Sequence, residues 1–294
     1  MKKRKIQATF ELDQFKQFDI LMKLVEKDIK SEVEGQPIFL WACENGHVEL
    51  VKIIVRNNFG VCPITAMGKG IHLAASNGHT EIIRLLYNHD YTAQKLMAYA
   101  HPSNPEYDFY GYNEIVEGFL EACEKGHTEI VRIFLNAGMD VTIKNNKGLC
   151  LAVENGHTEI VELLINTPDN NILKNYETGK KHVLSGRRYY ILDNKERDFL
   201  DQVFFLTVEK GHTEILRLLL EVQKELYEGY WASSLNDLLV NHATFKGHTQ
   251  MVEMLVDAGI NTDSGYVRLA LAFANKKGHM QIANILKKAG VKEQ

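Results

Sequence analysis

The sequence predicts an all-α solenoid of about seven helix–turn–helix repeats behind an N-terminal helical cap. The dipeptide Gly–His recurs along most of the chain, and an amphipathic helical pattern follows each copy. The composition, 45% hydrophobic and 24% charged over 294 residues, is typical of a chain that buries a core. The copies begin at Gly46, Gly78, Gly126, Gly156, Gly211, Gly247 and Gly278.

The intervals between Gly–His copies indicate one repeating unit with insertions. Successive copies are 32, 48, 30, 55, 36 and 31 residues apart. Four of these six intervals lie close to the ~33 residues of a common helical repeat. The other two fit the same repeat with ~15 and ~22 additional residues.

Each repeat carries the signals of two short helices joined by a tight turn. The Gly is expected to end the first helix in a left-handed conformation, where a Cβ would cost energy. In Thr128–Leu135, apolar residues at i, i+1, i+3 and i+4 form one face of a second helix. A small residue four positions before Gly lets neighbouring helices approach closely, so we expect Ala122 and Ala152 to be almost fully buried. The small residues are Ala42, Ala74, Ala122, Ala152, Thr207, Ala243 and Ala274.

These motifs resemble the ankyrin repeat over roughly residues 36–292. The stretch Gly-His-x-Glu-Ile-Val-x-x-Leu-Leu matches best, and Ile71–Ala75 retains the family's Leu-His-x-Ala-Ala core with one exchange. No repeat carries the complete Thr-Pro-Leu-His motif, so the turns are expected to be irregular. The resemblance implies a concave face of first helices and turn tips on which a protein partner binds.

The interval pattern also predicts the domain organisation. Residues 1–35 are expected to form an N-terminal helical cap or a degenerate repeat, and residues 36–294 the repeat array. Insertions are expected near 91–117, 167–201 and 222–239. Insertions in repeat proteins fall on one edge, which is often the binding edge. The alternative is that each stretch only lengthens a helix pair or decorates a turn.

The resemblance places partner contacts at the two positions before each Gly. Four of the first five repeats carry an acid at the earlier position and the last two carry none, so the binding face is expected to show a charge gradient. Aromatic and Arg side chains in the insertions are further candidates, because such residues concentrate binding energy. The candidates on first helices are Trp41, Glu44, Glu121, Glu124, Glu154, Glu209, His242 and Phe245. Those in the insertions are Tyr107, Phe109, Tyr110, Tyr112, Arg187, Arg188, Tyr189 and Tyr190.

Two Cys–His pairs have a spacing that zinc sites use, i and i+4. They are Cys43 with His47 and Cys123 with His127. The same position holds Ala75 and Val153 in two other repeats, which indicates a small buried core position. The Gly inside each pair also separates its residues onto different elements. We therefore expect neither a metal nor a cofactor.

A catalytic function is not expected from this chain. It contains no Gly-rich phosphate loop, His-Glu-x-x-His helix or Gly-x-Ser-x-Gly turn. Cys62 has no evident catalytic base, and even the longer insertion falls short of the ~40 residues below which a segment rarely folds alone. An enzyme that uses an inserted segment and a structural assembly module remain alternatives to a binding module.

Charge and cysteine content predict the environment and the partners. A net charge of −4 gives no bulk attraction to nucleic acid or to anionic membranes, and no apolar run is long enough for insertion. Four scattered cysteines and no secretory signal fit the reducing cytoplasm. We expect a protein partner, no nucleic acid, and a chain that is monomeric when free. Irregular arrays with long insertions loosely resemble ankyrin effectors that intracellular bacteria deliver, which would place the chain in host cytoplasm. Similar arrays in large DNA viruses and protists leave the source open.

Overall fold

The computed structural model describes residues 32–56, 64–88, 111–167, 182–184, 187–189, 194–226 and 230–293. The chain divides into two compact units, Met1–Met139 and Asp140–Gln294, and each is described by itself. Most of the cap expected at 1–35 lies outside the described residues.

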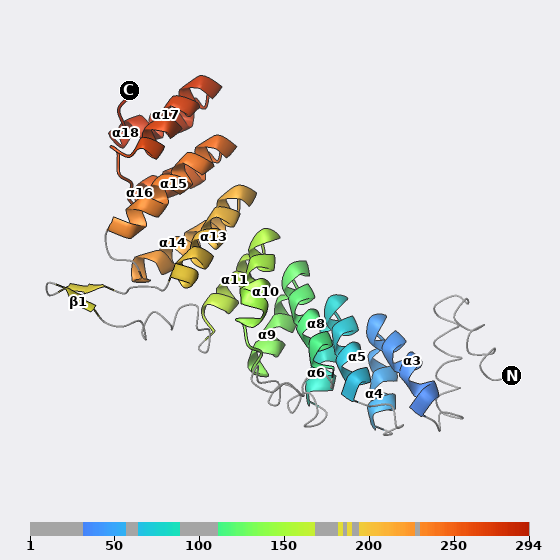
Figure 1. Cartoon of the computed structure of the whole chain (residues 1–294). Coiled ribbons are helices and arrows are strands. Elements are labelled where there is room, and N and C mark those ends of the chain that lie inside the picture. The colour runs from blue at the N-terminus through green and yellow to red at the C-terminus, as the bar shows by residue number, and fades with distance from the viewer. Residues whose placement is uncertain are drawn as a thin grey trace. The chain divides into compact units, whose positions relative to one another are not determined.

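The N-terminal unit contains three helix pairs, each closed around one Gly–His turn, within the part of the chain that is described (Figure 1). The first helices pack together, α5 on α3 and on α8, and the second helices pack in the same order, α6 on α4 and on α9. The unit is therefore a stack of helical hairpins with two helical layers. The first helices are α3 (Glu32–Glu44), α5 (Ile64–Ser76) and α8 (Tyr112–Lys125), and the second are α4 (Val48–Arg56), α6 (Thr80–Asn88) and α9 (Thr128–Asn136).

The C-terminal unit repeats this arrangement with four helix pairs in its described residues (Figure 1). Along the first helices, α13 packs on α10 and α15, and α15 packs on α17. Along the second helices, α14 packs on α11 and α16, and α16 packs on α18. The first helices are α10 (Ile143–Glu154), α13 (Asn194–Lys210), α15 (Tyr230–Lys246) and α17 (Gly265–Lys277). The second helices are α11 (Thr158–Ile165), α14 (Thr213–Leu226), α16 (Thr249–Asp257) and α18 (Met280–Lys288).

The predicted solenoid of helix–turn–helix repeats is confirmed, with one addition. A two-stranded antiparallel hairpin lies in the second insertion, where β1 (His182–Leu184) pairs with β2 (Arg187–Tyr189). Extended β-branched and aromatic residues can pair locally in such a segment without joining the helical stack. In the third stretch, 222–239, α14 continues to Leu226 and α15 begins at Tyr230.

Each Gly–His turn has the backbone that the sequence predicts. The seven glycines have φ between +75° and +81°, the left-handed region that disfavours a Cβ. The His N–H that follows donates a hydrogen bond to the carbonyl of the small residue four positions before Gly, as from His127 to Ala122 O at 2.9 Å. This bond closes the C-terminus of the first helix. The prediction that each dipeptide lies between two helices is confirmed.

The small residues four positions before Gly form the packing seam. All of them, including Ala122 and Ala152, have 0% exposure, as predicted. The one polar member, Thr207, satisfies its hydroxyl by donating to Val203 O at 2.8 Å. A larger side chain at this position would push neighbouring helices apart.

A second contact explains why Gly and His recur together. The imidazole of each of five repeats lies against the Gly of the repeat before it; a Cβ on Gly46 would stand 2.8 Å from the His79 ring. His79 Nε2 also lies 2.9 Å from Glu44 O, at the C-terminus of the preceding first helix. At Gly46, Gly78, Gly156 and Gly211 a Cβ would lie within 3.0 Å of that ring, so Gly is required there both for its backbone conformation and for the space that the next His occupies.

Side chains brace the irregular turns between repeats. Asp140 Oδ1 accepts hydrogen bonds from Thr142 N and Oγ1 at 2.9 and 2.7 Å, just before three residues with left-handed φ at the start of α10. Buried Asn236 donates to Gly259 O at 3.0 Å, and Asp237 accepts from Asn261 N at 2.8 Å. These bonds hold the turn before α17 in the absence of a Thr-Pro-Leu-His motif.

Candidate partner-binding surface

The first helices leave two rows of residues open to solvent. We call these the minus-two and minus-five positions, counted back from the Gly of each repeat, and together the first-helix face of each unit. Every minus-two residue except half-buried Ser76 is exposed, and every minus-five residue is half-buried. The minus-two residues are Glu44, Ser76, Glu124, Glu154, Glu209, Phe245 and Lys276. The minus-five residues are Trp41, Leu73, Glu121, Leu151, Leu206, His242 and Phe273.

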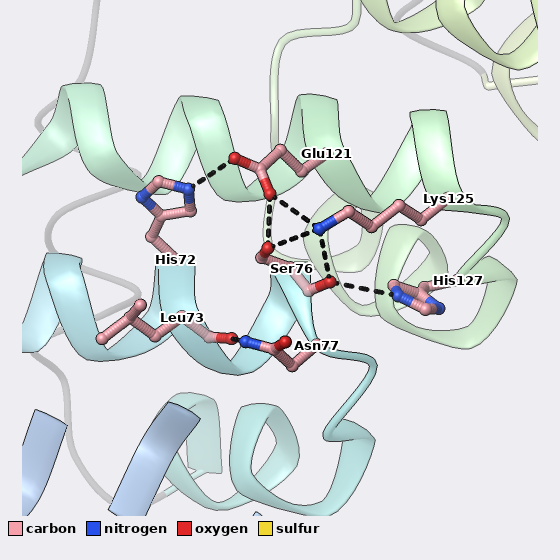
Figure 2. Close-up of polar contacts among 7 residues, drawn as sticks. All are labelled: His72, Leu73, Ser76, Asn77, Glu121, Lys125 and His127. Atoms are coloured by element: carbon pink, nitrogen blue, oxygen red, sulfur yellow. Dashed lines mark hydrogen bonds and ion pairs between the residues drawn. The ribbon is translucent and has the colours of Figure 1, made fainter. Parts of the chain in front are cut away.

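Glu121 is the centre of a polar cluster between α5 and α8, which Figure 2 shows. One carboxylate oxygen lies 3.0 Å from His72 Nε2. The other accepts hydrogen bonds from Ser76 Oγ and, at 3.1 Å, from Lys125 Nζ. Lys125 Nζ also donates to Ser76 O at 3.0 Å, so it ties the end of α5 to α8.

Burial raises the pKa of the Glu121 carboxyl, but its three hydrogen-bond donors outweigh that effect. The hydrogen bonds from Ser76, His72 and Lys125 lower the pKa from 4.5 to about 2. Glu121 is therefore ionised and engaged within the protein at neutral pH. This carboxylate, predicted as a partner contact, clamps two repeats together.

Two more predicted acids are engaged in the same way. Glu154 pairs with Lys210 of the next repeat at 3.1 Å. Glu209 pairs with Lys246 and, at 2.8 Å, with His242, and the Lys246 hydrogen bond is the main cause of its lowered pKa. In each case the Lys stands one residue before Gly in the following repeat. The acids alternate with cations along this face, so the predicted charge gradient is weaker than the acids alone indicate.

The predicted aromatic contacts are divided between different places. The Trp41 ring stacks on His47, with centroids 4.6 Å apart, and Tyr112 is half-buried at the start of α8. Phe245 is 62% exposed and contacts Phe273, with ring centroids 4.9 Å apart. Arg187, Arg188 and Tyr189 lie on β2, whereas Tyr107, Phe109, Tyr110 and Tyr190 lie outside the described residues.

Three residues near the predicted contacts were not among them: His72, Leu269 and Phe273. Of the residues that complete the Glu121 clamp, Ser76 and Lys125 hold positions just before Gly, where contacts were predicted, whereas no recurring signal pointed to His72. Phe273 holds the same minus-five position as the predicted contacts Trp41 and His242, which was an available signal, whereas Leu269 lies one helical turn earlier and had none. Both lie on the face of α17 that also carries the minus-two residue Lys276.

The cysteine positions behave as core rather than as ligands. Cys43 and Cys123 are fully buried in the column that holds Ala75 and Val153, and burial raises the pKa of the Cys123 thiol. Within the described ranges, no three His, Cys, Asp or Glu residues are grouped as metal ligands would be. The same part of the chain has no helix long and apolar enough to cross a membrane.

Stacked helical hairpins with a variable exposed face define the class of helical-repeat binding scaffolds. A family model described as ankyrin repeats, in three copies, matches residues 8–98 and 117–177, just over half of the chain. The chain belongs to the ankyrin-repeat family. Ankyrin repeats are generally protein–protein interaction modules, and their fold is typically non-enzymatic.

Solved structures include a similar fold. The crystal structure of the human ASB11 ankyrin repeat domain is 17% identical to this chain, with a TM-score of 0.48. The alignment covers 85% of this chain and 96% of that one. No curated protein matches the sequence.

Proposed function

We propose that this chain binds a partner protein through its first-helix face, with the insertions near 91–117 and 167–201 adding contacts. The proposal rests on the contrast between two positions of each repeat, one constant and buried, the other variable. The position four before Gly is small and fully buried throughout, whereas the minus-two position, exposed in every repeat except at half-buried Ser76, changes between Glu, Ser, Phe and Lys. Stacking fixes the first position and leaves the second to recognition.

The proposal makes the chain a binding module rather than an enzyme. Three acids of the first-helix face, Glu121, Glu154 and Glu209, are held in ion pairs between repeats, which is more typical of a rigid surface than of a catalytic centre. The repeat array is proposed to span 36–294. For residues 1–35, a family match that begins at residue 8 supports the degenerate-repeat alternative over a separate cap.

The proposed place of action is the cytoplasm. The chain has only four scattered cysteines, and Cys43 and Cys123 are buried in the helical core, which is compatible with a reducing compartment. A delivered bacterial effector that acts on a host protein is the narrower form of this proposal, and it rests only on the loose resemblance of irregular arrays. Partner capture with the full chain from a candidate host lysate, compared with a bacterial lysate, tests it.

Two double variants test the binding face against a captured partner. Glu124→Lys with Glu154→Lys is expected to weaken binding. Both side chains are exposed, so the fold should stay intact although the ion pair of Glu154 with Lys210 is lost. Exposed charge pairs are each worth about 0.2–1 kcal/mol, so the loss should appear mainly at low salt. Phe109→Ala with Tyr110→Ala tests the first insertion separately.

The control carries the same charge change on second helices. Glu162→Lys with Glu253→Lys alters two exposed acids of α11 and α16, and it should leave binding unchanged. Circular dichroism checks that all variants keep their helix content. If both test variants bind as well as the unaltered chain while the control binds less, the site belongs on the second helices and the proposal fails.

A further inference from the structure

The last two repeats expose large apolar side chains on their first helices. Among the described side chains, four large hydrophobic ones are more than half exposed: Phe245 at 62%, Met280 at 61%, Leu269 at 59% and Tyr266 at 54%. Three of the four lie on α15 and α17. Soluble proteins bury such side chains or use them, and a contiguous group marks an interaction site.

These side chains form one surface rather than scattered points. Tyr266, Leu269 and Phe273 are spaced i, i+3 and i+7, so they follow one face of α17. Phe245 on α15 extends this surface, with its ring 4.9 Å from that of Phe273. Asn241 Nδ2 donates to Tyr266 O at 3.1 Å, which fixes the start of α17 against α15. We call Phe245, Tyr266, Leu269 and Phe273 the aromatic patch.

Stacking of another repeat would not cover Phe245. Helix α17 already packs on α15, yet Phe245 remains 62% exposed. Glu209 holds the same minus-two position on α13, which has first helices packed on both sides, and it is also exposed. The minus-two position therefore stays open in a complete stack, and Phe245 is available to a separate molecule.

The two helices that carry the aromatic patch are predominantly positive. Helices α15 and α17 together carry Lys246, Arg268, Lys276 and Lys277, while their one carboxylate, Asp237, is 5% exposed. Lys246 is held by Glu209 of α13. Nearby Glu293 is occupied by Lys287 and Asn275, both at 2.7 Å.

Two cations at the end of α17 remain for a ligand. Lys276 and Lys277 are both exposed, and Lys277 Nζ lies 5.8 Å from the centre of the Phe273 ring. They are the charge that a bound segment would meet beside the aromatic rings.

We propose that the aromatic patch binds an acidic, amphipathic peptide segment of a partner protein. Aromatic or aliphatic side chains of the segment pack on Phe245, Leu269 and Phe273, and its carboxylates pair with Lys276 and Lys277. This inference rests on the proposed function and names the chemistry of the partner. A second copy of the chain fits less well, because it would bring two cationic surfaces together. A nucleic acid also fits less well, because it needs a longer positively charged groove than two lysines provide.

The test selects ligands with the full-length chain. A displayed library of random linear peptides is panned on the chain, and the enriched peptides are synthesised with a fluorescent label. The selected pool is expected to be enriched in Asp and Glu and in aromatic and aliphatic residues relative to the starting library. A pool with no acidic enrichment, or no enrichment of any peptide, overturns the proposal.

Three variants then locate the bound peptides by fluorescence anisotropy. Phe245→Ala with Leu269→Ala should lower the affinity for the peptides at least about tenfold, because both side chains are exposed anchors. Lys276→Glu with Lys277→Glu should weaken them too and remove most of the salt dependence of binding. Met280→Ala is the matched control: its side chain is 61% exposed but lies on α18, and affinity should not change.

The outcomes separate this inference from the proposed function. One outcome is that the peptides bind both patch variants with unchanged affinity but bind the Glu124→Lys, Glu154→Lys variant more weakly. That outcome overturns the aromatic patch as the site and supports the rest of the first-helix face. Peptides that ignore all of these variants overturn both. A dimer in sedimentation that Phe245→Ala dissociates shows a second copy as the occupant and overturns the proposal. The proposal is also overturned if a labelled oligo-dT binds more tightly than the peptides and its binding is lost in the Lys276→Glu, Lys277→Glu variant.

Discussion

Replacing Glu121 by Gln is expected to destabilise the Met1–Met139 unit at neutral pH. The substitution keeps the size of the side chain but removes the charge that His72, Ser76 and Lys125 stabilise. Because the cluster joins α5 to α8, the loss falls on the contact between two repeats. The individual helices should keep their structure.

The size of the loss follows from the pKa and the exposure of Glu121. A fall in the pKa from 4.5 to about 2 corresponds to about 3 kcal/mol at ~1.4 kcal/mol per unit. Solvent reaches 33% of the side chain, and screening of partly exposed pairs reduces the contribution to about 1–2 kcal/mol. For a unit of this size, we expect the melting temperature to fall by roughly 3–8 °C.

The pH dependence distinguishes a charge effect from a packing effect. The folded pKa of Glu121 lies below its unfolded value, so its stabilisation is complete above about pH 4.5 and is lost as pH falls towards 2. The difference in unfolding free energy between the unaltered chain and Glu121→Gln should shrink over that window. Urea unfolding at a series of pH values measures it, with exposed Glu44→Gln on α3 as the matched control.

Two results would refute this account of the clamp. One is a Glu121→Gln chain that is as stable as the unaltered chain at pH 7. The other is a stability difference that stays constant down to pH 2. NMR titration of the Glu121 carboxyl carbon gives the pKa directly, and Ser76→Ala should raise it because that variant removes one donor.

Three further predictions concern packing, turns and thiols. Ala152→Leu should overpack the seam between repeats and cost ~1–3 kcal/mol in urea unfolding; an unchanged midpoint would show that the packing face is misassigned. Gly156→Ala should lower the unfolding free energy more than Gly278→Ala. The two glycines have nearly equal φ, +77° and +75°, but only at Gly156 would the Cβ meet the next histidine ring, at 2.7 Å. Equal losses of stability would disprove the role of that contact. Elemental analysis should find no stoichiometric zinc, and chelation should not lower stability; one tightly bound metal per chain would contradict the assignment of Cys43 and Cys123 to the core.

The turns and the seam could be predicted because both are local constraints that recur with the repeat. A left-handed Gly and a small residue four positions earlier are required by the backbone of one hairpin. Their positions can be read from seven copies without knowing how the copies stack. The exposure of Phe245 could also be anticipated, since its position holds a charged residue in five of the six other repeats.

Contacts between repeats were harder to predict from the sequence. His72 and Glu121 are 49 residues apart, so their pairing depends on the stacking register across the first insertion. The Glu154–Lys210 pair spans the second insertion in the same way, although the recurrent Lys before Gly was an available signal. The hairpin of β1 and β2 was missed too, and the Ser185–Gly186 dipeptide between its strands was the turn signal that pointed to it.

The Gly–His dipeptide has a consequence for how such arrays grow and recombine. Its two residues are adjacent in sequence but serve opposite neighbours: the Gly receives the ring of the following repeat, and the His reaches back to the preceding one. The five described contacts of this kind are therefore all built from the same two residue types. At this contact, duplication, deletion or reordering of whole repeats leaves a compatible junction. The order of the repeats must therefore be specified by contacts that differ between copies, such as the Glu121 clamp. A chimaera whose repeats are exchanged between α5 and α8 should keep the Gly–His contact but lose the stability that the clamp adds between those repeats.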